Sequence, residues 1–355
     1  MKLTFIIFLQ ALITNVFACQ NDTLKLLFLG DIMQHQAQLD AARSTKGSSR
    51  DSRSYDYSSY FRHLEERFGN ADFRIANMET TFAKPPYSGY PSFSSPISLI
   101  SDSKRAGIDL FLAANNHICD KGERGLSGTL DAYDSLKVLY TGIYRNPQEE
   151  LIKNPLILEL KNFRIAFLNY TYGTNEIYVP QPFVVKLIDT SAIKRDLERT
   201  KEICPDFIIV CLHWGEEYRL KHSSGQERIE EFFYKNGTDI IIGSHPHVPQ
   251  DYRIEYGPDN EIKHITVYSL GNAISNMTAQ NTRIGMSAEI LLYREKGGTA
   301  RILPPKFEYI WTSRPNMFDK NFTILPVEEY LEKPELFKDK EDYRNMKRYY
   351  LRFNK

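Results

Sequence analysis

The sequence has no excess of either charge, and this limits what the protein can bind. Its 355 residues include 45 lysines and arginines against 45 aspartates and glutamates. A protein that binds nucleic acid mainly through phosphate contacts needs a basic surface, so nucleic acid is not an expected partner. Four cysteines are too few for a disulfide scaffold. The chain also lacks the repeated apolar segments of ~20 residues that a polytopic membrane protein needs, and its 42% hydrophobic content is typical of a soluble globular protein.

The first 18 residues have the pattern of an export signal. Lys2 precedes an apolar stretch that polar residues interrupt, and the stretch is too short for a good spanning helix, which needs ~20 apolar residues. Ala18 is a suitable small residue before a cleavage site. The following Cys19 completes V-F-A-C, which resembles the end of a bacterial lipoprotein signal. Simple cleavage after Ala18 is the alternative. In both cases we expect an exported protein of the cell envelope, which a lipid on Cys19 would anchor to the membrane.

The other three cysteines are not expected to form a disulfide. Their number is odd, so at least one is unpaired in an oxidising compartment. Cys204 and Cys211 flank an expected strand, and seven extended residues separate their backbones by more than ~20 Å. We expect these two and Cys119 to be small buried apolar residues.

Short apolar runs that end in polar residues recur along the chain. Such runs are typical of strands that are buried on both faces; they cover 24–29, 73–78, 109–114, 163–170, 207–212 and 239–243. Helical patterns lie between them at 60–68, 190–203 and 223–233. This alternation predicts an α/β fold in which helices pack on a sheet.

The later part of the chain has a different pattern. Residues 250–312 are typical of hairpins, for which we expect an antiparallel sheet stacked beside the first. The charged tail from about 315 is expected to form a surface helix. We therefore divide the chain into a signal peptide at 1–18, one domain at 19–315 and a charged helical extension at 316–355.

Polar residues suited to metal binding directly follow the expected strands. Ligands gather outside the carboxyl ends of the strands in open α/β sheets, so these residues should meet at one edge. A single histidine after a strand is usually a capped or surface residue, but this many such segments are hard to produce by chance. Two carboxylates, one amide and three imidazoles suit a pair of divalent ions. The expected ligands are Asp31, Glu79, Asn116, His213, His245 and His247.

Two features of this set suggest how it is arranged. Glu79 suits a bridging position because its two oxygens can reach different ions. His245 and His247 alternate around Pro246, so an extended backbone would direct both imidazoles the same way.

His117 and Asp120 are the expected catalytic residues. If Asn116 binds metal, the adjacent His117 can face the leaving group and donate a proton. Asp120, three residues later, is placed to orient that imidazole. Tyr172 and Asn175 are candidates for lining the cleft.

Six ordered motifs make the chain resemble a known family. They are G-D-I-M (30–33), N-M-E-T-T (77–81), N-N-H-I-C-D-K-G (115–122), H-W-G-E-E-Y (213–218), G-S-H-P-H-V-P-Q (243–250) and Y-S-L-G-N (268–272). Together they resemble the CapA family, named for capsule poly-γ-glutamate synthesis, which is similar to the calcineurin-like metallophosphoesterases. The likeness covers roughly 25–310. It implies a four-layer αββα sandwich of the metallo-dependent phosphatase type, with the six expected ligands at its edge.

The chain departs from the wider phosphoesterase pattern in its first motif. Met33 stands where those enzymes usually carry a histidine, so one metal site should be weaker. His35 could replace the missing ligand or contact substrate. Arg219 and His222 follow H-W-G-E-E-Y closely enough to hold an anionic substrate. A solvated loop is the alternative for all three.

Two functions from different classes remain open. The first is an exported metal-dependent hydrolase or transferase, in which two ions (Mn, Fe or Zn, one weakly held) activate a hydroxide against a phosphoester or glutamyl amide of a capsule or envelope polymer. The second is a non-catalytic envelope lipoprotein that binds or tethers an anionic polymer. The missing histidine favours the second function, whereas His117, which a tether does not need, favours the first. The expected partner is an anionic envelope polymer or a small phospho or glutamyl substrate.

Overall fold

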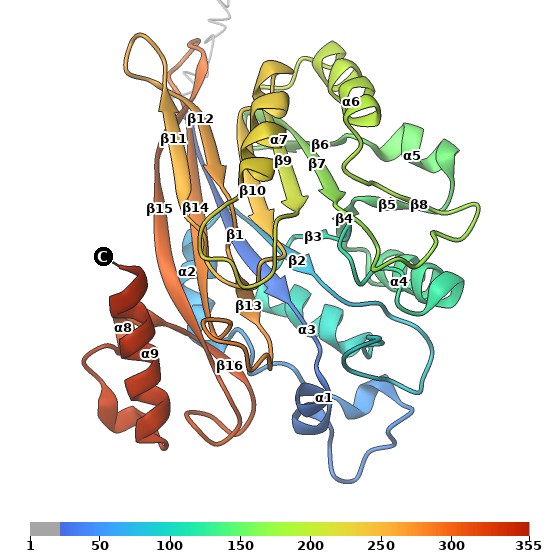
Figure 1. Ribbon diagram of the computed structural model, residues 1–355, viewed down its shortest axis with the longest axis vertical. Coiled ribbons are helices and arrows are strands. Elements are labelled where there is room, and N and C mark those ends of the chain that lie inside the picture. The colour runs from blue at the N-terminus through green and yellow to red at the C-terminus, as the bar shows by residue number, and fades with distance from the viewer. Residues whose placement is uncertain (1–21, 355) are drawn as a thin grey trace, which may run out of the picture.

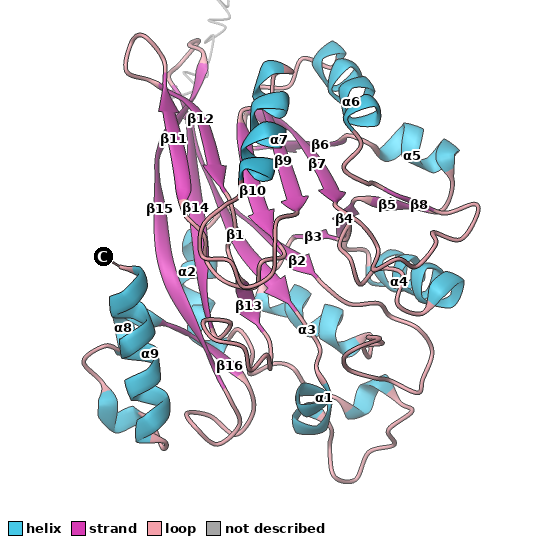
Figure 2. Cartoon of the chain, viewed as in Figure 1, coloured by secondary structure: helices cyan, strands magenta, loops and turns pink. Residues whose placement is uncertain are grey.

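The computed structural model describes residues 22–354 of the chain. The expected signal peptide at 1–18 and the expected lipidation residue Cys19 lie outside the described residues. Within them, a sheet of fourteen strands and a small sheet of two strands form the centre, and helices lie outside (Figure 1, Figure 2). No helix in this part of the chain is both long enough and apolar enough to cross a membrane.

The large sheet consists of two mostly parallel halves joined by long antiparallel strands, in the order β4-β3-β2-β1-β14-β15-β12-β10-β9-β7-β6. The first half contains β1 (Asp22–Ile32), β2 (Phe73–Met78), β3 (Leu110–Leu112) and β4 (Leu139–Thr141). The second contains β6 (Leu156–Leu160), β7 (Phe163–Thr171), β9 (Phe207–His213), β10 (Ile240–Ser244) and β12 (Ile262–Val267). The joining strands are β14 (Ile284–Arg294) and β15 (Ala300–Ser313). All six strands expected from the apolar runs are confirmed.

The remaining strands are short. Strand β11 (Tyr252–Tyr256) pairs with β12, β13 (Asn272–Ile274) runs parallel to β1, and β16 (Thr323–Pro326) pairs with β15. Strands β5 (Ile143–Tyr144) and β8 (Val184–Val185) form the small sheet. The expectation of a separate antiparallel sheet is wrong, because β14 pairs with β1 and β15 pairs with β12, which makes the hairpin strands part of one continuous sheet.

The two halves of the sheet face each other across a shared apolar core. Leu26 and Phe28 of β1 lie in one cluster with Ile209 and Cys211 of β9, which belongs to the other half. The residues between these in each strand point to the opposite face, where helices cover the sheet. Leu27 of β1 belongs to a second cluster, which includes residues of the helices that cover the first half. Val210 of β9 belongs to a third cluster, which includes residues of the helices that cover the second half. Side chains of a strand alternate between its two faces, so both faces are covered. The expected four-layer αββα arrangement is confirmed.

The helices cover the outer faces of the two halves. The first group is α1 (Gln36–Ala42), α2 (Glu65–Asn70), α3 (Ser98–Ala106) and α4 (Gly122–Leu136). The second group is α5 (Pro147–Lys153), α6 (Thr190–Glu202) and α7 (Ser224–Lys235). The last two, α8 (Val327–Tyr330) and α9 (Lys340–Phe353), lie beside β15, away from α6 and α7 (Figure 1). The expected tail helix is thus α9.

Four of the parallel strands are each preceded by an aspartate that forms a hydrogen bond with the neighbouring strand. The carboxylates of Asp72, Asp109, Asp206 and Asp239 accept hydrogen bonds from the backbone N–H groups of Lys25, Arg74, Arg164 and Ile208, respectively. The first three aspartates also form an ion pair with a lysine or arginine. Among the described residues, Asp239 has no cationic partner.

The cysteines of the described residues are unpaired, as expected, but one of them is placed differently. Cys119 and Cys211 are buried, whereas Cys204 is exposed. The expectation that Cys204 is buried is wrong because it follows the end of α6 in a turn with a positive φ of 51°, ahead of β9 rather than inside the core.

Candidate metal centre

The parallel pairing of the strands brings the motif residues to one edge of the sheet. Asp31, near the end of β1, is in register with Asn77 of β2 and with Asn272 of β13. His213, the last residue of β9, is in register with Ser244, the last residue of β10. Since parallel strands share the direction of their carboxyl ends, the residues that follow each strand come together as the sequence predicts.

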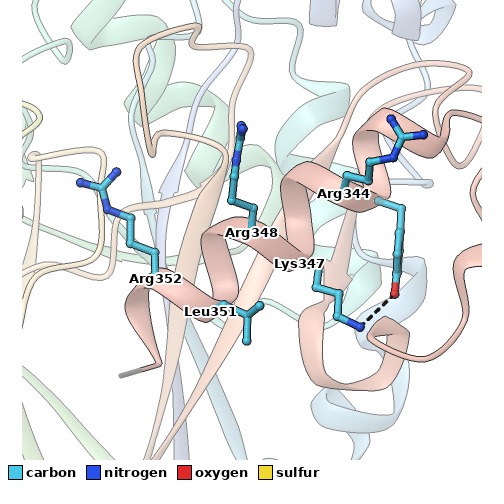
Figure 3. A pocket seen from close by; sticks show the side chains of 6 residues that line it. Arg344, Lys347, Arg348, Leu351 and Arg352 are labelled. Carbon is cyan, nitrogen blue, oxygen red and sulfur yellow. Dashed lines mark hydrogen bonds between the residues drawn. The ribbon is translucent and has the colours of Figure 1, made fainter.

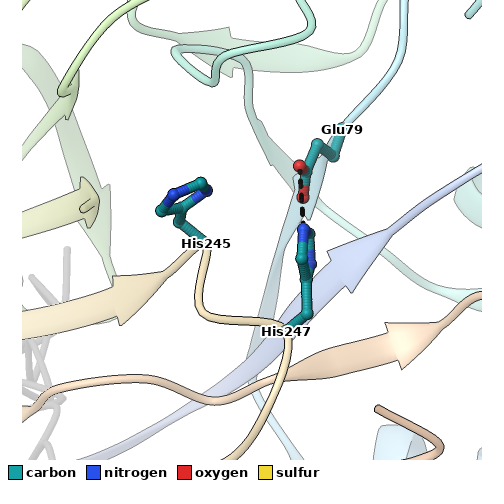
Figure 4. A group of neighbouring side chains, drawn as sticks. All are labelled: Glu79, His245 and His247. Atoms are coloured by element: carbon teal, nitrogen blue, oxygen red, sulfur yellow. Dashed lines mark ion pairs between the residues drawn. The ribbon is translucent and has the colours of Figure 1, made fainter. Parts of the chain in front are cut away.

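Five of the expected ligands form a compact buried cluster. Atoms of Asp31, Glu79 and His213 that could bind a metal ion lie within 4.8 Å of one another, and so do those of Glu79, His245 and His247 (Figure 4). Glu79 belongs to both groups, as a bridging ligand would, but its bridging role stays a prediction. Its Oε1 is 3.5 Å from His213 Nε2 and 3.8 Å from His247 Nε2. Two ligand atoms on one tetrahedral zinc ion lie ~3.4 Å apart, so the spacing suits shared coordination.

Two polar atoms of this cluster have no hydrogen-bond partner among the described residues. Glu79 Oε1 and His245 Nδ1 are buried and accept no hydrogen bond. A buried polar atom without a partner costs about 1–3 kcal/mol, and more when it is charged. A divalent ion would give both atoms a partner. The donor set of carboxylates and imidazoles therefore fits a metal ion.

The charges in the cluster are strongly coupled. Burial alone would raise the pKa of Asp31, but its hydrogen bond with His247 and the nearby imidazoles hold that pKa below its ordinary value. Burial would lower the pKa of His247, but the carboxylates of Glu79 and Asp31 raise it to about 9. A metal ion that binds this imidazole would therefore have to compete with a proton. Burial keeps the pKa of His245 well below its ordinary value, so His245 is neutral.

Asn116 joins the cluster through His213. Its Oδ1 lies 2.9 Å from His213 Nε2, and its amide nitrogen donates to Asn175 Oδ1 at 3.2 Å. The ring of Tyr172 lies 4.5 Å from that of His245 and nearly parallel to that of His213. Tyr172 and Asn175 therefore do line the site.

His117 is held in one orientation by Asp120. Its Nδ1 is 2.9 Å from Asp120 Oδ2, which also accepts a hydrogen bond from the backbone N–H of Phe93 at 2.7 Å. The Phe93 ring packs edge-on against the imidazole, 4.6 Å away. Among the described residues, no hydrogen-bond partner faces His117 Nε2, which leaves this atom for a substrate. The expected contact with Asp120 is confirmed; the catalytic role stays a prediction.

The structure does not bring the other candidate ligand into the cluster. His35 belongs to neither three-residue group. Its Nδ1 accepts a hydrogen bond from the backbone of Asn276 at 3.3 Å, and its ring packs edge-on against Phe93. Burial lowers its pKa to about 4. Met33, the residue that departs from the first-motif pattern, is buried.

The candidate substrate residues after β9 have other partners. Arg219 is exposed and pairs with Glu216 at 3.2 Å. Both ring nitrogens of His222 are held by carboxylates, at 2.8 Å by Asp251 and at 3.0 Å by Glu227. Burial alone would lower the pKa of His222, but these two carboxylates raise it. Neither side chain has a polar contact with the described cluster residues, so a role in substrate binding has no geometric support.

The turn that carries the histidine pair is not extended. His245 and His247 have positive φ angles of 98° and 58°, a backbone conformation that costs non-glycine residues energy. The backbone N–H of Tyr218 donates to Pro246 O at 2.8 Å and holds the turn closed. The expectation of an extended His-Pro-His segment is therefore wrong. Both imidazoles still reach the cluster because the turn bends over the edge of the sheet.

Two asparagines orient the ligands and were missed by the sequence argument. Asn77 donates to Asp31 Oδ1 at 2.7 Å and lies 3.3 Å from His213 Nδ1. Asn272 Oδ1 lies 3.0 Å from His247 Nδ1, which leaves Nε2 of that ring toward Glu79. Such partners fix ligand orientation and tune metal affinity. The available signal was their place within N-M-E-T-T and Y-S-L-G-N, directly at strand ends.

Comparison with known proteins identifies relatives. A family model described as "Bacterial capsule synthesis protein PGA_cap" matches residues 25–277. "Capsule biosynthesis protein CapA" of Bacillus anthracis is 27% identical over 294 residues, which are 79% of this chain and 66% of that protein. "PGA biosynthesis protein CapA" of Bacillus subtilis (strain 168) is 25% identical, over 79% of this chain and 70% of that protein. The chain thus spans about two thirds of the length of these curated relatives.

Solved structures with a similar arrangement include phosphoesterases. A putative 5'-nucleotidase from Staphylococcus aureus has a TM-score of 0.49 and 16% identity, over 92% of this chain and 58% of that one. The calcineurin-like phosphoesterase YfkN from Bacillus subtilis has a TM-score of 0.45 and 13% identity, over 82% of this chain and 91% of that one.

Proposed function

Because the chain belongs to the family of bacterial capsule synthesis proteins described as PGA_cap, we propose that it is a metal-dependent hydrolase or transferase that acts on an anionic capsule polymer. The observation that carries this proposal is the buried cluster in which Glu79 is common to two groups of possible ligands. The contact between His117 and Asp120, next to Asn116, supports a role for His117 as the proton donor. The names of the two relatives refer to capsule and PGA biosynthesis, and they support poly-γ-glutamate as the polymer.

The residues of the centre would have different roles in metal binding and in proton transfer. Asp31, Glu79, Asn116, His213, His245 and His247 would hold two divalent ions, with Mn, Fe and Zn as candidates. Bound ions of this kind activate water and polarise the oxygens of a phosphoester or an amide. Asp120 accepts the Nδ1 hydrogen of His117 and so directs Nε2 away from itself. A proton on Nε2 can then pass to the leaving group. Tyr172 packs against the imidazole of His245.

Export and lipid anchoring belong to the same proposal. The pattern of residues 1–18 and the V-F-A-C sequence support them. Mass spectrometry of the protein purified from membranes should find a mature N-terminus at Cys19 that carries lipid. Cys19→Ala should move the protein from the membrane fraction to the soluble one. An unmodified Cys19 at the N-terminus of the mature wild-type protein would contradict the anchor while leaving export intact.

The proposed activity is tested by metal content and turnover together. The purified protein is assayed with manganese on bis(p-nitrophenyl) phosphate and on poly-γ-glutamate. We expect His117→Gln to lower turnover about 10²- to 10⁴-fold, the usual contribution of a general acid, while the bound metal stays unchanged. The control is His264→Gln, which alters a histidine stacked on Tyr234 in another part of the fold and should leave both quantities unchanged.

A non-catalytic polymer-binding role is the second candidate. The observation that favours it is Met33, a buried thioether in the place where related metal centres carry an imidazole. Absence of turnover on both substrates, with metal bound and poly-γ-glutamate held tightly, would replace the enzyme with this tether.

A further inference from the structure

Helix α9 presents a row of basic side chains on its outer face. The side chains that line this shallow groove are Tyr343, Arg344, Lys347, Arg348, Leu351 and Arg352 (Figure 3). The arginines stand at every fourth position, so they lie along one side of the helix. In a chain whose net charge is zero, this face is a local excess of positive charge.

The charges of this basic face are only partly compensated. Arg348 donates to the side chain of Asn345, and Arg352 donates to the side chain of Asn281 at 3.2 Å; both partners are neutral amides. Arg344 pairs with Glu341 at 2.7 Å, but its side chain remains 68% exposed. Lys347 has Glu332 as its acidic neighbour, at 3.5 Å, and that glutamate is 89% exposed. The face can therefore accept further anionic groups.

The opposite face of α9 is already used by the domain. Asp342 is buried and accepts hydrogen bonds from Trp311 Nε1 and Ser313 Oγ. Met346 is buried, and Tyr349 stacks on Trp311 at 5.8 Å. Membrane-surface helices insert a broad apolar face between lipids. On the outer side of α9 the large apolar or aromatic side chains among the basic ones are Leu351 and the partly buried Tyr343, which do not form a broad apolar face, so a lipid surface is the weaker fit.

The chemistry of the arginines suits a γ-linked polycarboxylate. The three arginines follow one another at intervals of four residues along one side of α9, where the helix rises ~6 Å between them. A γ-linked glutamate chain carries one free carboxylate on every unit, so it can present several anionic groups to this row. Guanidinium groups bind carboxylates through paired hydrogen bonds.

One loop connects the basic face with the metal centre. It runs between β13 and β14, over residues 275–283. Arg352 donates to Asn281 in this loop. Asn272, which contacts His247, donates to the carbonyl of Thr282 at 2.9 Å. The row of arginines therefore ends at the segment that borders the centre.

We infer that this face of α9 holds the carboxylates of a poly-γ-glutamate chain and keeps the polymer beside the metal centre. The choice of poly-γ-glutamate as the polymer rests on the proposed function. The basic face itself is observed independently of that proposal. The affinity should come mainly from exposed charges, so it should fall as salt is added.

The test measures polymer binding separately from metal binding and turnover. The full mature protein and the triple variant Arg344→Gln/Arg348→Gln/Arg352→Gln are titrated with poly-γ-glutamate at ~0.1 M salt, where exposed charges still act over ~10 Å. We expect at least a tenfold rise in Kd for the variant. The control Arg228→Gln/Lys235→Gln/Arg301→Gln removes three basic side chains from α7 and β15 and should bind as the wild type does. Glutamine preserves helix propensity, and circular dichroism checks that both variants are folded.

Metal content and hydrolysis of bis(p-nitrophenyl) phosphate separate the two proposals. Polymer binding that depends on the three arginines, in a protein that hydrolyses nothing, would support the basic face and reject the hydrolase. Equal Kd values for the two triple variants would overturn the inference, as would absence of polymer binding by the wild type. Arginine-dependent binding to vesicles with 30% phosphatidylglycerol, without polymer binding, would overturn it in favour of a membrane contact.

Discussion

Asp239→Asn should make the protein more stable at neutral pH, although it removes a charge that accepts a backbone hydrogen bond. Asp239 accepts the N–H of Ile208 at 2.7 Å, and burial raises the pKa of its carboxyl to about 6. Unlike the equivalent aspartates at 72, 109 and 206, it has no cationic partner among the described residues. An asparagine oxygen can accept the same hydrogen bond without placing a charge in this largely desolvated position.

The magnitude follows from proton linkage. The folded chain holds the Asp239 proton up to about pH 6, whereas the unfolded chain releases it near the ordinary value of about 3.9. Between these values the folded state binds more protons than the unfolded state, so stability falls as pH rises through this window. Two pH units correspond to about 3 kcal/mol. Because the side chain is partly exposed, we expect Asp239→Asn to gain about 1–2 kcal/mol above pH 7 and little at pH 4.

Urea unfolding of the wild type and of Asp239→Asn at pH 4.0 and pH 7.5 measures this difference in the free energy of unfolding. The other titratable groups are the same in both proteins, so their contributions cancel in the comparison. Asp206→Asn is the matched control. Asp206 accepts the N–H of Arg164 in the same way but also pairs with Arg294, so its replacement should destabilise the protein at pH 7.5. A stability difference between wild type and Asp239→Asn that does not change with pH would refute the reasoning.

Three further predictions concern the centre and its support. Glu79→Gln should remove both ions, whereas His213→Gln should remove one, as counted by elemental mass spectrometry; equal losses would contradict the shared position of Glu79. Asn272→Ala should weaken metal affinity about 10- to 100-fold, because the amide orients the imidazole of an adjacent ligand; competition with a fluorescent chelator measures this, and unchanged affinity would contradict it. Gly30→Ala should destabilise the fold by about 1–3 kcal/mol or more, because the added Cβ would lie 1.8 Å from Gly271 O; an unchanged melting temperature would show that the two backbones can separate.

The sequence predicted the parts of the fold that depend on burial over several residues. Leu26, Phe28 and Leu29 belong to an apolar run because both faces of β1 are covered, and such a run is visible without a structure. The meeting of Asp31 with His213 follows from the same regularity, because parallel strands end at one edge.

The features that sequence could not supply depend on partners distant in the chain. The His245–His247 turn is closed by the backbone of Tyr218, and nothing local indicates this. His222 has no free ring nitrogen because Asp251 and Glu227 take both. Asn77 is a common polar residue whose role depends on its register with Asp31.

A metal ion bound at the centre would also link the two halves of the continuous sheet. Asp31 and Glu79 lie at the carboxyl ends of strands of one half, whereas His213 and His245 lie at the carboxyl ends of strands of the other. An ion held by residues from both halves would close the seam between them, so unfolding would require its release. Added metal at one hundred times its Kd should then raise the free energy of unfolding by about 2.7 kcal/mol. Ions bound for the proposed chemistry would in this way also clamp the two layers together.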